Sequence, residues 1–326
     1  MNKDVSLCDA KPVTSREEWF QRIDAIGEDL GYFQPVGQRH SAFFLDDSPT
    51  LLVTFETVAE CRARDDQMPM GYGLAKTVGW SHLCLIADGE TWYRDPAVYG
   101  YFDRLVDDAF FEDFDRVVFY GAGMAGYAAA AFSVTAPGAT VLAIQPFATL
   151  DARITPWDRR HFGQRRLDFA DRYGYAPEMV EGAGEVFLIY DPAQTLDSMH
   201  AALFTRPFVT KLPCPNLGGE IETALGEIGI LAKLIEAAGQ GRLTASVFWQ
   251  LFRARRDHLP YLRRLLDRLD AAERPHLAAM LCRNVLERVG SATHFRNRQG
   301  ELEAELLARR QCEPETAAPD QSPPAA

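Results

Sequence analysis

Short apolar runs alternate with segments of helical length over residues 51–212, and this alternation restricts the fold more than any other feature. A continuous apolar run fits a strand buried on both faces, and helices between such strands are the usual crossovers of a parallel sheet. We therefore predict an α/β fold, with a mostly parallel sheet covered by helices on both faces. The runs are LLVTF at 51, HLCLIA at 82, RVVFY at 116, TVLAI at 140, EVFLIY at 185 and FVTKL at 208.

Local signals place further elements. Ser15 followed by Glu18 matches a capping box and predicts a helix that ends near Gly31. Residues 41–57, SAFFLDDSPTLLVTFET, predict a hairpin of two strands around an Asp-Asp-Ser-Pro turn. We expect helices at 72–79, 97–109, 124–135, 158–172 and 195–204, and helical patterns at 216–238, 243–257, 260–271, 275–289 and 298–311.

These patterns divide the chain into four parts. We expect a disordered N-terminus at 1–14, an α/β domain at 15–240 and a helical extension at 241–312. Residues 313–326, EPETAAPDQSPPAA, contain too few apolar residues to bury, and we expect a disordered tail there.

The net charge of −12 argues against binding to nucleic acid or to an anionic membrane. Residues 242–310 differ from the rest, with 14 Arg, no Lys and 8 acidic residues, so they carry +6 and the remainder carries −18. This basic region is either a helical lobe that docks on the acidic body or a surface for an acidic partner. We expect homodimerisation through these C-terminal helices.

Metal, cofactor and membrane signals are weak in this sequence. The six cysteines form no C-x-x-C pair and the histidines show no ligand spacing, so we predict neither a metal nor a bound cofactor. The longest apolar stretch, 125–144, is interrupted by Pro137 and Gly138, which disfavours a membrane span. The N-terminus lacks the apolar core of an export signal, and we expect a cytoplasmic protein.

Residues 116–133, RVVFYGAGMAGYAAAAFS, consist of an apolar strand, a run of small residues and a helix. Gly121, Gly123 and Gly126 spell G-x-G-x-x-G, which is typical of dinucleotide binding. That motif also needs an acidic residue at the end of the next strand, where this chain has Gln145, with Asp151 further on. An NAD(P)- or nucleotide-binding oxidoreductase is therefore an alternative hypothesis.

The same turn resembles the nucleophile elbow of the α/β-hydrolase superfamily, in which a strand, G-x-nucleophile-x-G and a helix follow one another. YGAGMAGYA at 120–128 is similar to the Tyr-Gly-Ser-Ser-Met-Gly-Gly-Tyr-Ala elbow of a bacterial subset. The resemblance covers roughly residues 40–238, includes ADGETWYRDPAVYGYFDRL at 87–105, and extends to the position of the elbow after the third parallel strand.

The resemblance implies a triad that this chain does not carry. Gly123 occupies the nucleophile position, and Asn216 stands near the position of the histidine base, with no His between His200 and His258. Asp197 matches the acid, with Asp191 as the alternative. Because nucleophile and base act as a unit, losing both predicts a catalytically degenerate hydrolase relative. Its pocket would bind a small molecule or a protein partner.

Other residues complete the candidate site. Cys214 or His200 could serve a hydrolase with a non-standard nucleophile or base. Arg159, Arg160 and His161 could bind an anion, or pair locally with Asp158, Asp168 and Asp171. The resemblance assigns an oxyanion amide to the stretch after the first parallel strand, Thr54 to Thr57. The pocket and elbow residues are then Thr54, Phe55, Gly121, Ala122, Met124, Ala125 and Gly126.

Overall fold

A computed structural model of the protein describes residues 13–289 and 292–312. The chain forms two compact units, Met1–Phe252 and Arg253–Ala326, which are treated separately below. Most of the N-terminus and all of the tail for which we expected disorder lie outside the described residues. None of the described helices combines the length and the apolar character needed to cross a bilayer.

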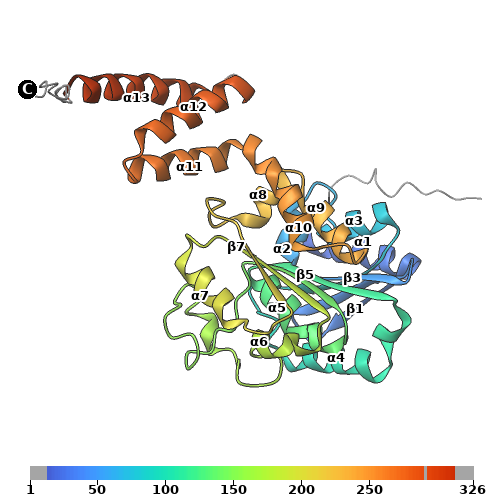
Figure 1. The fold of residues 1–326 in the computed structure, drawn as a ribbon. Coiled ribbons are helices and arrows are strands. Elements are labelled where there is room, and N and C mark those ends of the chain that lie inside the picture. The colour runs from blue at the N-terminus through green and yellow to red at the C-terminus, as the bar shows by residue number, and fades with distance from the viewer. Residues whose placement is uncertain (1–12, 290–291, 313–326) are drawn as a thin grey trace, which may run out of the picture. The chain divides into compact units, whose positions relative to one another are not determined.

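The first unit is built on one eight-stranded sheet with the order β1-β2-β4-β3-β5-β6-β7-β8 (Figure 1). Strands β3 to β8 run parallel to one another, whereas β2 is antiparallel to both β1 and β4. Five of the six apolar runs lie wholly within these parallel strands, as predicted, and the sixth does so except for Phe208, which precedes β8. The strands are β1 (Gly31–Val36), β2 (His40–Leu45), β3 (Thr50–Thr57), β4 (Ser81–Ala87), β5 (Arg116–Ala122), β6 (Thr140–Ile144), β7 (Glu185–Tyr190) and β8 (Val209–Pro213).

The predicted hairpin at 41–57 is wrong in its pairing. Both strands exist, but β2 pairs with β1 and β4, and β4 lies between β2 and β3. The Asp-Asp-Ser-Pro segment therefore connects two strands that are not neighbours. The true hairpin joins β1 and β2, in the register Val36 opposite His40.

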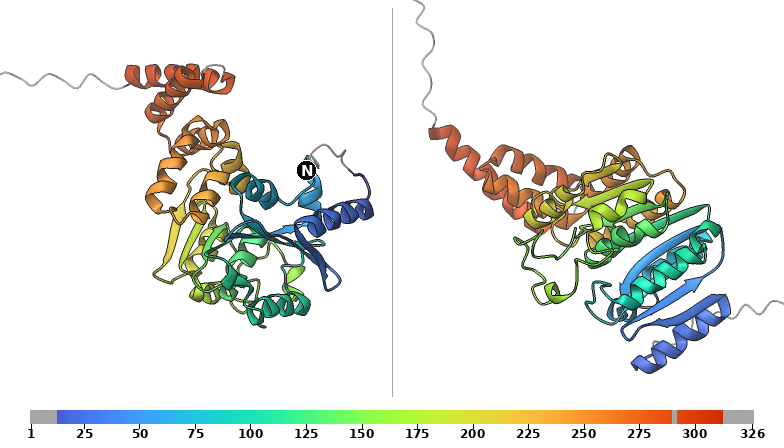
Figure 2. Two further views of the ribbon diagram at one scale, coloured as in Figure 1. Left: turned by 90° about the vertical axis from the view of Figure 1, so that its right-hand side faces the viewer. Right: turned by 90° about the horizontal axis from the view of Figure 1, so that it is seen from below.

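Helices cover both faces of the sheet, as the two further views also show (Figure 2). Side chains of α4 and α5 pack into the larger core on one face, while α1, α2 and α3 pack into a smaller core on the other. Ser15 and Glu18 form the predicted capping box of α1. The helices are α1 (Arg16–Leu30), α2 (Val58–Ala63), α3 (Met70–Val78), α4 (Pro96–Asp107), α5 (Met124–Phe132), α6 (Ala176–Met179), α7 (Thr195–Leu203), α8 (Ile221–Glu227), α9 (Leu231–Gly239) and α10 (Ala245–Leu251).

The helix predicted at 158–172 does not form. Residues 158–172 contain turns and one short 3₁₀ segment, η4 (Gln164–Arg166). Their aspartates explain this difference, because each accepts a hydrogen bond from a nearby backbone N–H. Asp158 accepts from Arg160, Asp168 from Ala170, and Asp171 from Arg172. Such bonds satisfy the backbone locally and compete with helix formation.

The second unit is helical. It contains α11 (Leu259–Ala271), α12 (Pro275–Val289) and α13 (Thr293–Cys312). Tyr261, Leu262 and Leu266 form the buried face of α11. Arg298 of α13 pairs with Asp270 of α11 at 3.0 Å, so a charged contact joins the two helices.

Candidate functional site

The turn between β5 and α5 has the backbone of an elbow. Gly123 lies between the two elements with φ 55° and ψ −116°, a conformation that side-chain-bearing residues rarely adopt. A Cβ at Gly121 would lie 2.3 Å from the carbonyl oxygen of Ala125, and a Cβ at Gly126 would lie 3.0 Å from that of Ile144. By contrast, a Cβ at Gly123 would meet no atom within 4 Å. Gly121 and Gly126 thus allow the strand and the helix to pack closely. Gly123 allows the backbone strain of the turn, and the space next to its Cα is open.

A cavity of about 340 Å³ lies above this turn, and we call it the elbow cavity. It opens where parallel strands end, the region in which α/β sheets usually bind ligands. Of the predicted site residues it brings together Ala122, Gly123, Met124, Ala125, Arg160, His161 and Asp197. An adjoining cavity of about 40 Å³ is lined by Thr54, Phe55 and Gly121 among others. Neither lining includes Gly126, Arg159, Asp191, Cys214 or Asn216.

Three of the predicted site residues, Asp191, Cys214 and Asn216, lie outside the linings of both cavities. The Asp191 carboxylate is buried and accepts hydrogen bonds from the backbone N–H groups of Ala193, at 2.9 Å, and Gly218, at 2.8 Å. It therefore fixes the loop after β8, in which Asn216 adopts a positive φ of 69°. Cys214 is fully buried, with its thiol 3.4 Å from the carbonyl oxygen of Leu212.

Arg160 is held by two carboxylates. Its guanidinium donates to Asp197 at 2.6 Å and to Asp158 at 2.7 Å, and it stacks over the Phe147 ring at 4.6 Å. Asp197 also accepts from the Gln145 amide at 2.7 Å, and the Gln145 carbonyl accepts from Ile221 N–H at the start of α8. This network ties the loops after β6, β7 and β8 into one wall of the cavity.

His200 completes the network from behind. Its Nδ1 accepts from Ala148 N–H at 3.1 Å, so its Nε2–H donates to Asp158 at 2.9 Å. Burial lowers the pKa of His200, although the hydrogen bond and charge of Asp158 oppose this. Burial opposes ionisation of Asp158, but hydrogen bonds from His200 and Arg160 hold its pKa well below the usual value. Both ring nitrogens of His200 are therefore engaged, away from the cavity.

Several polar side chains line the smaller cavity, and the sequence analysis did not predict them as site residues. Glu56 near the end of β3 pairs with Arg64 at 2.5 Å and accepts from Met70 N–H at 2.7 Å. Burial raises the pKa of Glu56 to about 7, against the opposing charge of Arg64. Tyr120 of β5 donates to Glu222 of α8, and burial raises the pKa of that carboxyl. Glu56 could have been predicted as a site residue, because it lies near the end of an apolar strand. No local sequence pattern marks Glu222 as a site residue.

The elbow cavity is acidic. Glu60, Glu220 and Glu222 line it, and they outnumber its basic groups even though Asp197 and Arg160 pair with each other. His161 lies 3.6 Å from the Glu90 carboxylate and packs against Trp92 and Phe147. Among residues 13–289 and 292–312, no three His, Cys, Asp or Glu side chains are placed to hold a metal ion.

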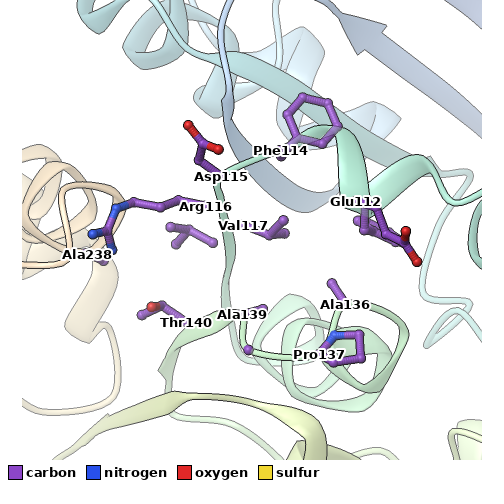
Figure 3. A pocket seen from close by; sticks show the side chains of 13 residues that line it. Glu112, Phe114, Asp115, Arg116, Val117, Ala136, Pro137, Ala139, Thr140 and Ala238 are labelled. Atoms are coloured by element: carbon purple, nitrogen blue, oxygen red, sulfur yellow. The ribbon is translucent and has the colours of Figure 1, made fainter.

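Another cavity of about 340 Å³ lies at the opposite end of the strands (Figure 3). Its lining includes Arg116 and Thr140, the first residues of β5 and β6, together with Glu112, Asp115 and Pro137. It contains none of the predicted site residues. The two cavities have similar volumes, so volume does not indicate which of them binds a ligand. The cavity above Gly123 is the better candidate, because it lies at the elbow and at the carboxyl ends of the parallel strands.

No protein-family model matches this chain, and no curated protein matches it in sequence. Among solved structures it resembles the glycosylation-associated protein complex Gap123 from Streptococcus agalactiae, with 12% identity and a TM-score of 0.43 over 61% of this chain and 44% of that one. It also resembles the capsule O-acetyltransferase of Neisseria meningitidis serogroup A, with 11% identity and a TM-score of 0.42 over 61% and 91% of the two chains. The esterase domain of a Rhodothermus marinus protein gives 13% identity and a TM-score of 0.31 over 56% and 85%.

These TM-scores are below 0.5, so the fold is assigned from the chain's own sheet. The strand order, the antiparallel β2 and the sharp β5–α5 turn define an α/β-hydrolase-type fold, as the resemblance implied.

Proposed function

We propose that this protein binds a ligand in the elbow cavity and lacks serine-hydrolase activity. The observation that carries the proposal is Gly123, which has the backbone of a nucleophile elbow and no side chain. Glycine has no hydroxyl or thiol to attack a carbonyl carbon. The elbow is then kept as the floor of a binding cavity of about 340 Å³, within the usual size range of ligand pockets.

The missing base supports the same conclusion. Asn216 is not a proton acceptor at neutral pH, and His200 has both ring nitrogens engaged by Ala148 and Asp158. Asp191, the alternative acid, holds backbone N–H groups instead of an imidazole. Cys214, the alternative nucleophile, is buried outside the cavity lining.

The charges that line the cavity also support the absence of serine-hydrolase activity. Acyl transfer develops a negative oxygen, which hydrolases stabilise with hydrogen-bond donors and positive ends of dipoles. Here the start of α5 faces a cavity lined by Asp197, Glu60, Glu220 and Glu222. Such carboxylates oppose an oxyanion and favour ligands rich in hydrogen-bond donors.

The test uses a fluorophosphonate probe and a panel of activated esters and thioesters. We expect neither labelling nor turnover above a heat-treated control, and labelling of any serine of the folded protein contradicts the proposal. The double variant Gly123→Ser with Asn216→His is then compared with Gly123→Ala with Asn216→His. If the variant with Gly123→Ser has esterase activity and the variant with Gly123→Ala does not, the missing nucleophile and base account for the lack of activity in the natural protein.

The dinucleotide alternative is tested separately with NAD, NADP and FAD. The Gln145 amide, which would have to hold a ribose, already bonds Asp197 and Ile221. We therefore expect no change in the thermal midpoint. A ligand at 100 times its dissociation constant would stabilise the fold by about 2.7 kcal/mol, which such an assay detects.

A further inference from the structure

The smaller cavity beside the elbow shares a wall with the elbow cavity, and we call it the side chamber. Four residues line both cavities, namely Glu60, Ala122, Ala125 and Glu222. The side chamber has a volume of about 40 Å³, against about 340 Å³ for the elbow cavity. Because one water molecule needs a site of about 10–15 Å³, the side chamber has room for a small head group and not for a bulky one.

The side chamber is more acidic than basic. Its ionisable lining consists of Glu56, Glu60 and Glu222, one guanidinium, that of Arg64, and the Tyr120 phenol. Glu56 is only 5% exposed, and Arg64 is its ion-pair partner at 2.5 Å. Neither Glu60 nor Glu222 forms an ion pair with Lys, Arg or His of residues 13–289 and 292–312. The lining thus contains two more carboxyl groups than guanidinium groups.

Glu60 and Glu222 are each held through one oxygen. Oε1 of Glu222 accepts from the hydroxyl of Tyr120, which is buried in β5. Oε2 of Glu60 accepts from the N–H of Thr57 at 2.7 Å and from its hydroxyl at 2.8 Å. The second oxygen of each carboxyl forms no hydrogen bond within the described chain. Both side chains are therefore fixed in place and keep one acceptor for a ligand.

The pKa values agree with a shortage of positive charge. Burial raises the pKa of Glu56 to about 7, and it also raises that of Glu222, although the hydrogen bond from Tyr120 opposes the shift. The charge of Glu60 adds to the rise at Glu222, so these two carboxyls lie close enough to repel each other. A cation between them would remove the repulsion and favour the ionised forms.

The shape of the site favours an ammonium group over other cations. In the part of the chain that the structure describes, no three His, Cys, Asp or Glu side chains are arranged to hold a metal ion. An ammonium is a compact charge with three N–H donors, whereas a guanidinium is a broad plane. The elbow cavity adds apolar surface from Met124, Phe147 and Ile221, against which the rest of a ligand would pack.

We propose that the ligand of the elbow cavity is a primary amine on an apolar body, whose ammonium group enters the side chamber and pairs with Glu222 and Glu60. This inference rests on the proposed function, because it names the ligand class of the same cavity.

The experiment is isothermal titration of the full chain with four probes that share a phenyl ring on a short chain. They are phenethylamine, phenethyl alcohol, hydrocinnamate and trimethylphenethylammonium. We expect phenethylamine to bind about tenfold more tightly than the alcohol, which lacks the charge, and than the trimethyl compound, whose head group is bulky and has no N–H. Hydrocinnamate should not bind, because its carboxylate meets carboxylates.

Variants locate the ammonium group. Glu222→Gln keeps an acceptor for Tyr120 and should weaken phenethylamine about tenfold without weakening the alcohol. Glu220→Gln removes the same charge from the elbow cavity alone, and the loss should be about threefold because that side chain is exposed. Ala125→Leu narrows the shared wall and should abolish the preference for the amine. Glu28→Gln, on the exposed face of α1, is the distant control and should bind like the wild type.

The outcomes separate this inference from the proposed function. If the alcohol or hydrocinnamate binds as tightly as the amine, the inference fails while the elbow cavity remains a binding site. If none of the probes binds, the inference also fails, and the fluorophosphonate test still decides on hydrolase activity by itself. Equal losses in Glu222→Gln and Glu28→Gln would overturn the placement of the ammonium group. Should Glu222→Gln not unfold cooperatively on heating, Glu60→Gln takes its place.

Discussion

The elbow cavity and a groove of about 590 Å³ beside the β2–β3 connection use charge in opposite ways. The groove is lined by Tyr32, Phe44, Phe110 and Phe114 together with Asp46, Asp47 and Asp113. Around the elbow cavity Arg160 lies between Asp158 and Asp197, and Gln145 links Asp197 to α8, so many polar groups satisfy one another. At the groove Asp46, Asp47 and Asp113 are exposed and form no ion pair with Lys or Arg of the described chain. Internally paired charges hold loops in position, whereas exposed carboxylates that form no ion pair should add little to the stability of the fold.

Of the two regions, the elbow should be the more sensitive to substitution, because its backbone is tightly packed at Gly121. Gly121→Ala places a Cβ 2.3 Å from the carbonyl oxygen of Ala125, where neither backbone can yield. We expect a loss of about 3 kcal/mol or more in the free energy of unfolding. Gly123→Ala meets open space and bears only backbone strain, for which about 2 kcal/mol is expected. Urea unfolding measures both, and a larger loss for Gly123→Ala would contradict the packing argument.

The paired network is tested by Asp158→Ala, which leaves Arg160 and His200 without their shared carboxylate. We expect a loss of about 3 kcal/mol, at the lower end for a broken buried pair, because the Arg160 side chain remains 36% exposed. Guanidinium unfolding provides the measurement. Asp47→Ala at the groove is the control and should leave the free energy of unfolding almost unchanged. Equal losses would remove the distinction between the two regions.

The buried Glu56 carboxyl should make the free energy of unfolding depend on pH, unlike the exposed carboxylates of the groove. Its pKa rises from 4.5 to about 7 in the folded state, so the folded protein binds more protons than the unfolded chain between these values. The stability that Glu56 contributes is therefore present below pH 4.5 and is lost as pH rises to about 7, on the order of 3 kcal/mol in all. The difference in unfolding free energy between wild type and Glu56→Gln should follow this slope. A difference independent of pH would show that burial does not perturb this carboxyl.

The smallest effect is expected at the groove. Asp46→Asn, Asp47→Asn and Asp113→Asn together remove like charges that pair with no Lys or Arg of the described chain. We expect the thermal midpoint to change by ~2 °C or less. A larger fall would mean that these carboxylates stabilise the fold, and the groove would then resemble the elbow cavity.

Sequence patterns were sufficient where the determining interaction is local. The alternating apolar runs indicated the parallel sheet because burial on both faces excludes polar residues from its strands. Ser15 and Glu18 indicated the start of α1, since the capping bonds join residues three apart. The glycines at 121–126 indicated the elbow, as a sharp strand-to-helix turn requires small residues.

The same reasoning misplaced elements that depend on distant partners. Residues 41–57 looked like a hairpin, but β4 from farther along the chain inserts between β2 and β3. Residues 158–172 had a helical pattern, but the aspartates bonded nearby backbone N–H groups instead. Arg160 was a candidate for anion binding, and its pairing with Asp197, 37 residues away, became visible only in the structure.

By itself, then, the sequence determined a layered α/β domain with a glycine-rich turn between a strand and a helix, because periodicity, capping and small residues act over a few positions. Only the tertiary structure decided the strand order, the Asp158–Arg160–Asp197–His200 network and the pairing of Tyr120 with Glu222. Those features join residues tens of positions apart, and their energies depend on burial, which no short stretch of sequence specifies.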